Sequence, residues 1–111
     1  MSEKKFSFGS EPKMLEVPIG DKAKFEFVGE PKIVETEWGE KYSFPILLVG
    51  HPSYDTLPLN CNWESKCQVA KELYNGYNDA GPQGKKFKTA YNNSDWLLTR
   101  FDNGSYWIDQ Q

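Results

Sequence analysis

The sequence has little of what catalytic and metal sites are usually built from. Its 111 residues include one histidine, His51, and two cysteines, Cys61 and Cys67, whose spacing is not that of a zinc knuckle. It contains no G-x-S-x-G or H-E-x-x-H motif, no P-loop and no dinucleotide fingerprint. We therefore expect reduced structural thiols in a protein that is not an enzyme and that uses no metal or other cofactor.

Long apolar runs and a strong excess of one charge are also missing. No segment is apolar over the length needed to cross a bilayer, and the charged start of the chain lacks the apolar core of a signal peptide. We expect a cytoplasmic protein with no membrane partner. The net charge of -3 argues against a protein that grips duplex phosphates by bulk electrostatics.

What the chain does have is a strong strand pattern over residues 21 to 49. Apolar and charged residues alternate up to Phe27, which predicts a half-buried strand. Gly29 and Pro31 interrupt the pattern before it resumes at residues 32 to 36. Because glycine inside a strand marks a bulge or bend and proline cannot donate to a ladder, we expect one long strand that bends at Gly29.

A hairpin turn is expected directly after this bent strand. Gly39, after Trp38, supplies the positive φ that a short turn requires. The second strand, Glu40 to Val49, then places Tyr42 on one face and Lys41 on the other.

One helix is expected among the remaining strands. A third strand, Tyr54 to Cys61, leads into a helix that Asn62 caps and that runs to Tyr74, where Asn75-Gly76 ends it. Three short strands follow, Lys85 to Tyr91, Trp96 to Phe101 and Ser105 to Ile108, with a turn at Asp102-Asn103-Gly104 between the last two. Residues 1–13 are expected to form a flexible arm and residues 14–111 a single domain.

This order of elements resembles an OB fold over residues 21 to about 108. The resemblance implies a mainly β protein, a five-stranded Greek-key barrel with one helix between strands three and four. The strand at the C-terminus is one more than that fold requires. An SH3-like barrel and a small α+β sheet are the alternatives.

Within OB folds, the chain looks like the single-stranded-DNA-binding domains of the replication protein A type, including small single-domain forms of archaea and their viruses. The resemblance implies binding of single-stranded DNA, without catalysis, in replication, repair or strand protection. In such domains the ligand crosses the second and third strands between the loops that join strands one to two and four to five.

The residues expected to contact the strand are aromatic, basic or amide side chains near those loops. Aromatic faces stack on bases, lysine and arginine pair with phosphates, and asparagine reaches base edges. A segment free of acidic residues, 82 to 94, adds three lysines. The candidates are Lys32, Trp38, Lys41, Tyr42, Lys85, Lys86, Lys88, Tyr91, Asn92, Trp96 and Arg100.

Each aromatic candidate also has a structural interpretation. For Trp38, a cross-strand pair with Tyr42 has the same weight as a stacking role. The residues expected in the core are Phe25, Phe27, Phe44, Phe87, Phe101, Trp96 and Trp107. Two alternative functions stay open, an RNA-binding OB domain, which we favour less than a DNA-binding one, and an OB-type module that binds a basic protein partner.

Overall fold

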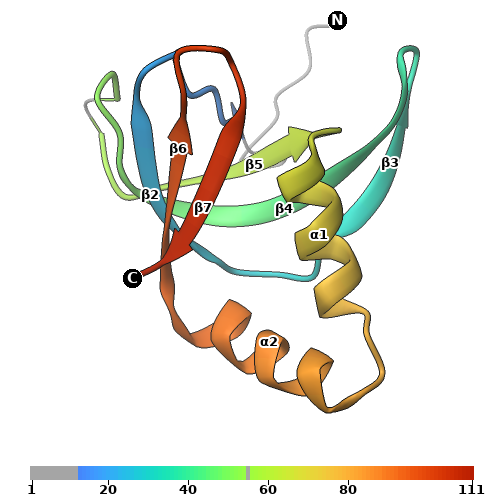
Figure 1. Cartoon of the computed structure of the whole chain (residues 1–111). Coiled ribbons are helices and arrows are strands. Elements are labelled where there is room, and N and C mark those ends of the chain that lie inside the picture. The colour runs from blue at the N-terminus through green and yellow to red at the C-terminus, as the bar shows by residue number, and fades with distance from the viewer. Residues whose placement is uncertain (1–12, 55) are drawn as a thin grey trace, which may run out of the picture.

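A computed structural model of the chain describes residues 13–54 and 56–111 (Figure 1). The flexible arm expected at residues 1–13 lies outside this description except for the backbone of Lys13, which begins a short strand.

Strands predominate, as expected, and the seven in the described part of the chain form one strongly curved sheet. All neighbours pair antiparallel except β1, which runs parallel to β5. The order is β1-β5-β4-β2-β6-β7, and β3 pairs with β4. The strands are β1 (Lys13–Met14), β2 (Lys22–Phe27), β3 (Lys32–Thr36), β4 (Gly39–Gly50), β5 (Leu59–Ser65), β6 (Asp95–Arg100) and β7 (Tyr106–Gln110).

The bend predicted at Gly29 is confirmed. Strands β2 and β3 both pair with the long strand β4, one with each half of it. A Cβ atom at Gly29 would lie 2.7 Å from Cγ of Pro45, and the Val28 amide donates to the Pro45 carbonyl at 2.9 Å. The chain thus turns tightly over Pro45, where only glycine leaves enough room.

The first helix begins later than predicted. Strand β5 continues to Ser65 because Trp63 points into the core with strand alternation, so Asn62 lies in a strand and caps nothing. Helix α1 (Gln68–Tyr77) is capped instead by the thiol of Cys67, which accepts from the Ala70 amide. The helix also runs past the stop expected at Asn75-Gly76.

The strand predicted from Lys85 to Tyr91 is wrong, because these residues belong to a second helix, α2 (Pro82–Asn93). Pro82 stands in its first turn, where the fixed φ of proline favours a helix. Phe87 and Tyr91, four residues apart, share one face of this helix and both contact the core. The chain therefore has two helices between β5 and β6 where one was expected. Neither described helix has the length and apolarity needed to cross a membrane.

The core fills the concave side of the sheet and is rich in aromatic rings. Phe25, Phe27 and Phe44 are buried as predicted, and Trp96 is buried with them. Two core predictions are wrong. Phe101 lies in the exposed β6–β7 turn and Trp107 points out from the edge strand β7, so both side chains are largely exposed.

The described strands do not close into a hydrogen-bonded barrel. Strands β5 and β7 face each other across a seam, with the rings of Trp63 and Tyr106 5.8 Å apart, and no ladder joins them in the described part. At one end of the seam the Leu15 amide donates to the carbonyl of Asn62 at 2.7 Å. Helix α1 packs at the other end, where it contacts β7.

Candidate nucleic-acid interface

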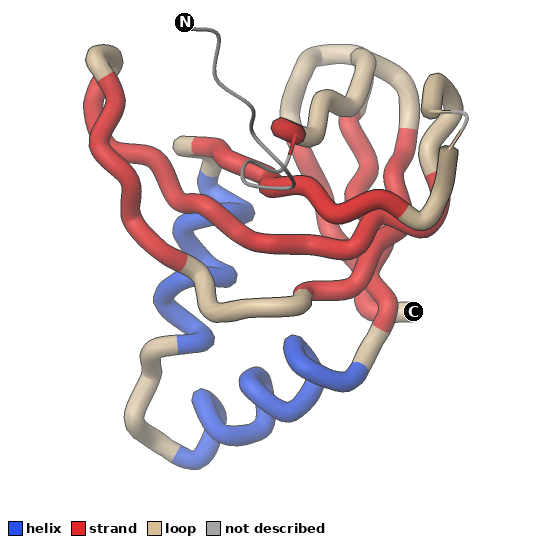
Figure 2. The backbone as a smooth tube through the Cα atoms, turned by 180° about the vertical axis from the view of Figure 1, so that it is seen from behind, coloured by secondary structure: helices blue, strands red, loops and turns tan. Residues whose placement is uncertain are grey.

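The β3–β4 hairpin extends beyond the rest of the sheet and carries an exposed tryptophan at its tip (Figures 1 and 2). Gly39 has the predicted positive φ of 106°. The Thr36 hydroxyl donates to the Gly39 carbonyl at 2.6 Å and accepts from the Trp38 amide at 3.1 Å. These bonds order the turn backbone while the indole of Trp38 stays 74 % exposed.

A lysine that is not among the expected site residues contacts the backbone of this tip. Lys66 follows β5, and its ammonium group donates to the Trp38 carbonyl. Glycine at position 39 also gives Lys66 room, because a Cβ there would lie 3.2 Å from the ammonium nitrogen. No local pattern indicates this contact, because it joins residues 28 apart in the chain.

The two candidate lysines of the hairpin lie on the convex side of the sheet, which we call the outer face. Strand residues alternate between faces, so Lys41 and Phe44, three residues apart on β4, point to opposite sides of the sheet. Because Phe44 is buried in the core, Lys41 points away from the core. The ladder sets Val34 opposite Lys41, so Lys32, two residues before Val34, shares this face.

Strand β5 adds polar groups to the outer face. Cys61 and Trp63 are buried, so the residues between and beside them turn outward. These are Asn60, Asn62 and Glu64. The amides can hydrogen-bond base edges, as Asn92 was expected to do.

Tyr42 does not belong to the outer face. Its ring lies 5.1 Å from that of Tyr74 on α1, between the sheet and the helix. The cross-strand pair expected between Trp38 and Tyr42 is likewise not formed, because Trp38 lies beyond the end of the ladder. Trp38 is therefore the one aromatic candidate of the hairpin that is free to stack.

The candidates of α2 lie at the other end of the molecule from the hairpin tip, as both views show (Figures 1 and 2). Lys85, Lys86, Lys88 and Asn92 are exposed on this helix, and the Lys88 ammonium lies 4.8 Å from the centre of the Tyr77 ring. The single interface expected for all the lysines is therefore divided between two separate surfaces.

Two aromatic candidates are core residues and cannot stack on a base. Tyr91 is fully buried, stacks on Phe27 with ring centres 4.0 Å apart, and donates through its hydroxyl to the Gly29 carbonyl at 2.8 Å. Trp96 is 6 % exposed and also contacts Phe27. The two residues are buried for different reasons: the helix α2 turns Tyr91 inward, whereas Trp96 faces the core from β6 by strand alternation.

Arg100 is occupied with backbone contacts. Its guanidinium donates to the Val17 carbonyl at 3.1 Å and to the Gly104 carbonyl at 3.4 Å, and it lies 5.2 Å from the centre of the Tyr106 ring. These contacts fasten the β6–β7 turn to the segment before β2. We assign Arg100 to the structure of that end of the sheet.

Acidic residues surround the tip as well as basic ones. Glu35, Glu37 and Glu40 flank Trp38 and are exposed. They oppose an approaching phosphate and balance the charges of Lys41 and Lys66. Any binding at this face must therefore depend more on stacking than on charge.

The described residues contain no group of three or more potential metal ligands. His51 is held in its loop by an Nε2 contact of 2.7 Å to the Glu16 carbonyl and by the Ser53 amide, which donates to Nδ1 at 3.0 Å. Its ring stacks on Tyr54. These contacts give His51 a structural part in joining two loops.

Burial raises the pKa of the Cys61 thiol to about 11. The thiol thus stays protonated in the folded chain at a pH where the unfolded chain already ionises. Between about pH 9 and 11 the free energy of unfolding should fall, by at most about 1.4 kcal/mol per pH unit for this one proton. Urea unfolding across this range should show the fall, and the Cys61→Ala variant should show a shallower one. An equal slope in both would remove Cys61 as the cause.

Compared with models of protein families, with curated proteins and with solved structures, the chain has no match.

Proposed function

We propose that this protein binds single-stranded DNA along the outer face of β4 and β5, with Trp38 stacking on a base. The observation that carries the proposal is the indole of Trp38, 74 % exposed at the end of an ordered hairpin. An exposed tryptophan lowers the solubility of a protein. Stacking of a base on its flat aromatic face accounts for the exposure of Trp38.

The pairing pattern supports an OB-type arrangement. If β2 and β3 count as one bent strand, then β4, β5, β6 and β7 take the places of the second to fifth strands. The first strand pairs with the second and fourth, the second with the third, and the fourth with the fifth. Helical residues stand between the third and fourth, as the resemblance implies. The open seam and the second helix are departures from that pattern.

In such an arrangement the outer face of β4 and β5 is the surface that a single strand would cross. Lys32 and Lys41 would meet phosphates there, and the amides of Asn60 and Asn62 would meet base edges. Few cations take part, so the binding is of modest strength and depends on salt.

The direct test is a titration of tryptophan fluorescence with oligothymidylate, oligouridylate and a duplex, each at low and moderate salt. Saturable quenching by single strands, weaker at the higher salt, is the expected result. A stronger response to oligouridylate would move the assignment to RNA. A flat response to all three at low salt would refute the proposal.

A matched pair of charge variants locates the site. Lys41→Gln removes a cation from the outer face, and Lys86→Gln removes one from the exposed surface of α2. We expect Lys41→Gln to weaken binding and to lower the slope of log K against log salt by about 1. Lys86→Gln should change neither. The reverse outcome would place the strand on α2.

A further inference from the structure

The outer face of the sheet continues beyond the proposed nucleic-acid interface, over β2, β6 and β7 (Figure 1). Ala23 and Phe25 on β2 and Leu98 on β6 are buried in the core, so the residues next to them point outward. The ladders align these outward residues in two rows that cross the three strands. One row is Lys22, Thr99 and Trp107, and the other is Lys24, Leu97 and Asp109.

Two aromatic rings are exposed on this part of the outer face. The Phe101 amide donates to the Ser105 carbonyl at 2.8 Å and continues the ladder of β6 and β7, so Phe101 points to the same face as Thr99. Phe101 is 46 % exposed, and Trp107, its diagonal neighbour, is 55 % exposed. Large apolar side chains that share one exposed face indicate a surface that binds a partner.

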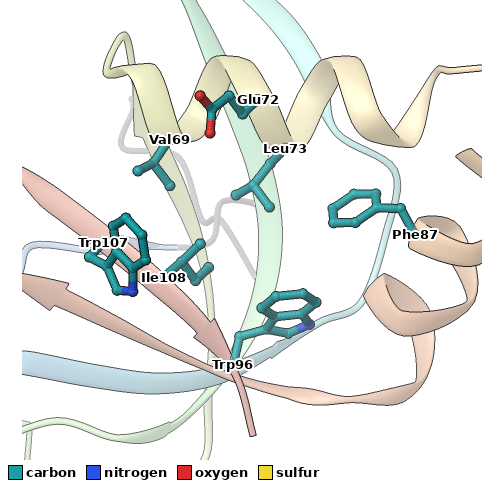
Figure 3. Close-up of a pocket in the computed structure, with 7 residues that line it drawn as sticks. All are labelled: Val69, Glu72, Leu73, Phe87, Trp96, Trp107 and Ile108. Atoms are coloured by element: carbon teal, nitrogen blue, oxygen red, sulfur yellow. The ribbon is translucent and has the colours of Figure 1, made fainter. Parts of the chain in front are cut away.

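The β7 side of this surface is aromatic and acidic. The Asp109 carboxylate accepts from Nε1 of Trp107 at 2.9 Å, so the two side chains lie together on the outer face. Trp107 also lies at one end of a pocket of about 220 Å³ beside α1, next to Val69 and far from Phe87 (Figure 3). The indole therefore stays at the surface, where both its ring and the carboxylate beside it can meet a cation.

The β2 side of the surface is basic. Lys22 and Lys24 are exposed there, and Lys24 makes a 3.8 Å ion pair with Asp95 in which the two side chains remain 46 % and 43 % exposed. Such an exposed pair is weak and leaves Lys24 able to meet a second carboxylate. Two cations thus lie on one side of β6, and the ring of Trp107 and the carboxylate of Asp109 lie on the other.

From this arrangement we propose that the outer face of β2, β6 and β7 binds a second copy of the chain, face to face, about a two-fold axis parallel to β6. Such an axis lays the β2 side of each copy over the β7 side of the other. Lys24 then meets Asp109 of the second copy. Lys22 meets the ring of Trp107 of the second copy, which is a cation–π contact. An axis across the strands would instead lay the lysines of β2 over each other, where they repel.

The residues of β6 suit a position on the axis. There each residue lies opposite its own counterpart, and Leu97 and Thr99 carry no charge that could repel its copy. Asp95, at the start of β6, already has Lys24 as its counter-charge. An axis parallel to β6 also aligns the strands of the two sheets, as packed sheets do to within about 30°.

The charges of this surface favour a second copy over a nucleic acid. Asp95 and Asp109 repel phosphates, whereas in the two-fold arrangement each carboxylate has a lysine near it. The proposed dimer uses other strands than the proposed nucleic-acid interface on β4 and β5. The two proposals are therefore independent, and either could hold without the other.

Sedimentation velocity of the full chain over a series of concentrations tests the association. The expected result is a species of twice the 12.8 kDa chain mass that dissociates on dilution. A monomer at every concentration would overturn the proposal. Dissociation of the dimer by oligothymidylate would also overturn it, because the strand would then occupy this face.

Exchanged charges test the direction of the axis. Lys24→Glu and Asp109→Lys each set like charges opposite each other, so each should raise the dimer Kd by about 10-fold or more. The variant with both changes restores opposite charges and should return the Kd to within about 3-fold of that of the parent. Lys86→Glu makes the same change of charge on α2 and should leave the Kd unchanged. A double variant no better than the single ones would overturn the arrangement.

An apolar variant tests the interface without disturbing an ion pair. Phe101→Ser removes an exposed ring near the axis and should raise the dimer Kd by about 10-fold. Ile33→Ser, at the 44 % exposed Ile33 of β3, is the matched control and should have no effect on the Kd. Equal values for the parent and Phe101→Ser would place the interface elsewhere and overturn the proposal.

Discussion

Replacing Tyr91 with alanine is expected to lower the free energy of unfolding by about 3 to 5 kcal/mol, the range for truncating a buried aromatic side chain. Tyr91 is fully buried, and its ring stacks on Phe27 and meets Tyr77 edge-on at 4.8 Å. The substitution therefore leaves a cavity between α2 and the sheet. Urea unfolding followed by circular dichroism measures the loss.

The hydroxyl of Tyr91 can be tested separately. It donates to the carbonyl of Gly29 at 2.8 Å, and so joins α2 to the bend between β2 and β3. Tyr91→Phe keeps the ring and removes this bond, which should cost about 1 to 3 kcal/mol because the partly buried carbonyl loses its partner. If Tyr91→Ala unfolded no more readily than Tyr91→Phe, the ring would contribute nothing and our description of the core would be wrong.

The second large effect concerns binding. Trp38→Ala should weaken the complex with oligothymidylate by about 1 to 3 kcal/mol, the amount that one base stacked on an aromatic ring contributes. The free energy of unfolding should stay within about 0.5 kcal/mol of the parent, because the indole packs against little of the protein. Fluorescence anisotropy of a labelled oligonucleotide gives the affinity without relying on tryptophan emission.

Trp107 offers a matched control. It is 55 % exposed, but it lies on β7, which β2 and β6 separate from β4 in the sheet. Trp107→Ala removes the same side chain and should leave oligonucleotide affinity unchanged. Equal losses in the two variants would mean that exposed tryptophan binds nucleic acid wherever it occurs, and that the hairpin has no special part.

The strand half of this fold could be predicted because its signals are local. The bend depends on Gly29 and the turn on Gly39, and each residue dictates backbone geometry where it stands. The helical half of the fold could not be predicted in this way. Residues 86 to 88 alternate between lysine and phenylalanine as in a strand, and only the proline before them indicates a helix start.

Part of the candidate site could be predicted, because strand alternation is also a local signal. Lys32 and Lys41 fall on the outer face because strand alternation places them there, whereas Tyr42 lies on the other face and packs on a helix. Lys66 reaches Trp38 only through the tertiary fold, so no pattern in the sequence indicates it. Tyr91 and Trp96 carry the right chemistry for stacking, but burial, which is a property of the whole fold, removes them.

Strand β4 runs through two environments that should differ in the rate of amide exchange. Around Ile46 it is fully buried and lies between β2 and β5, whereas near Gly39 it is exposed and β3 alone pairs with it. Amide hydrogens should therefore exchange with solvent slowly in the second half of this strand and quickly toward the tip. A ligand that stacks on Trp38 would slow exchange at the tip first, and it would lose part of its affinity to the entropy of ordering that end of the hairpin.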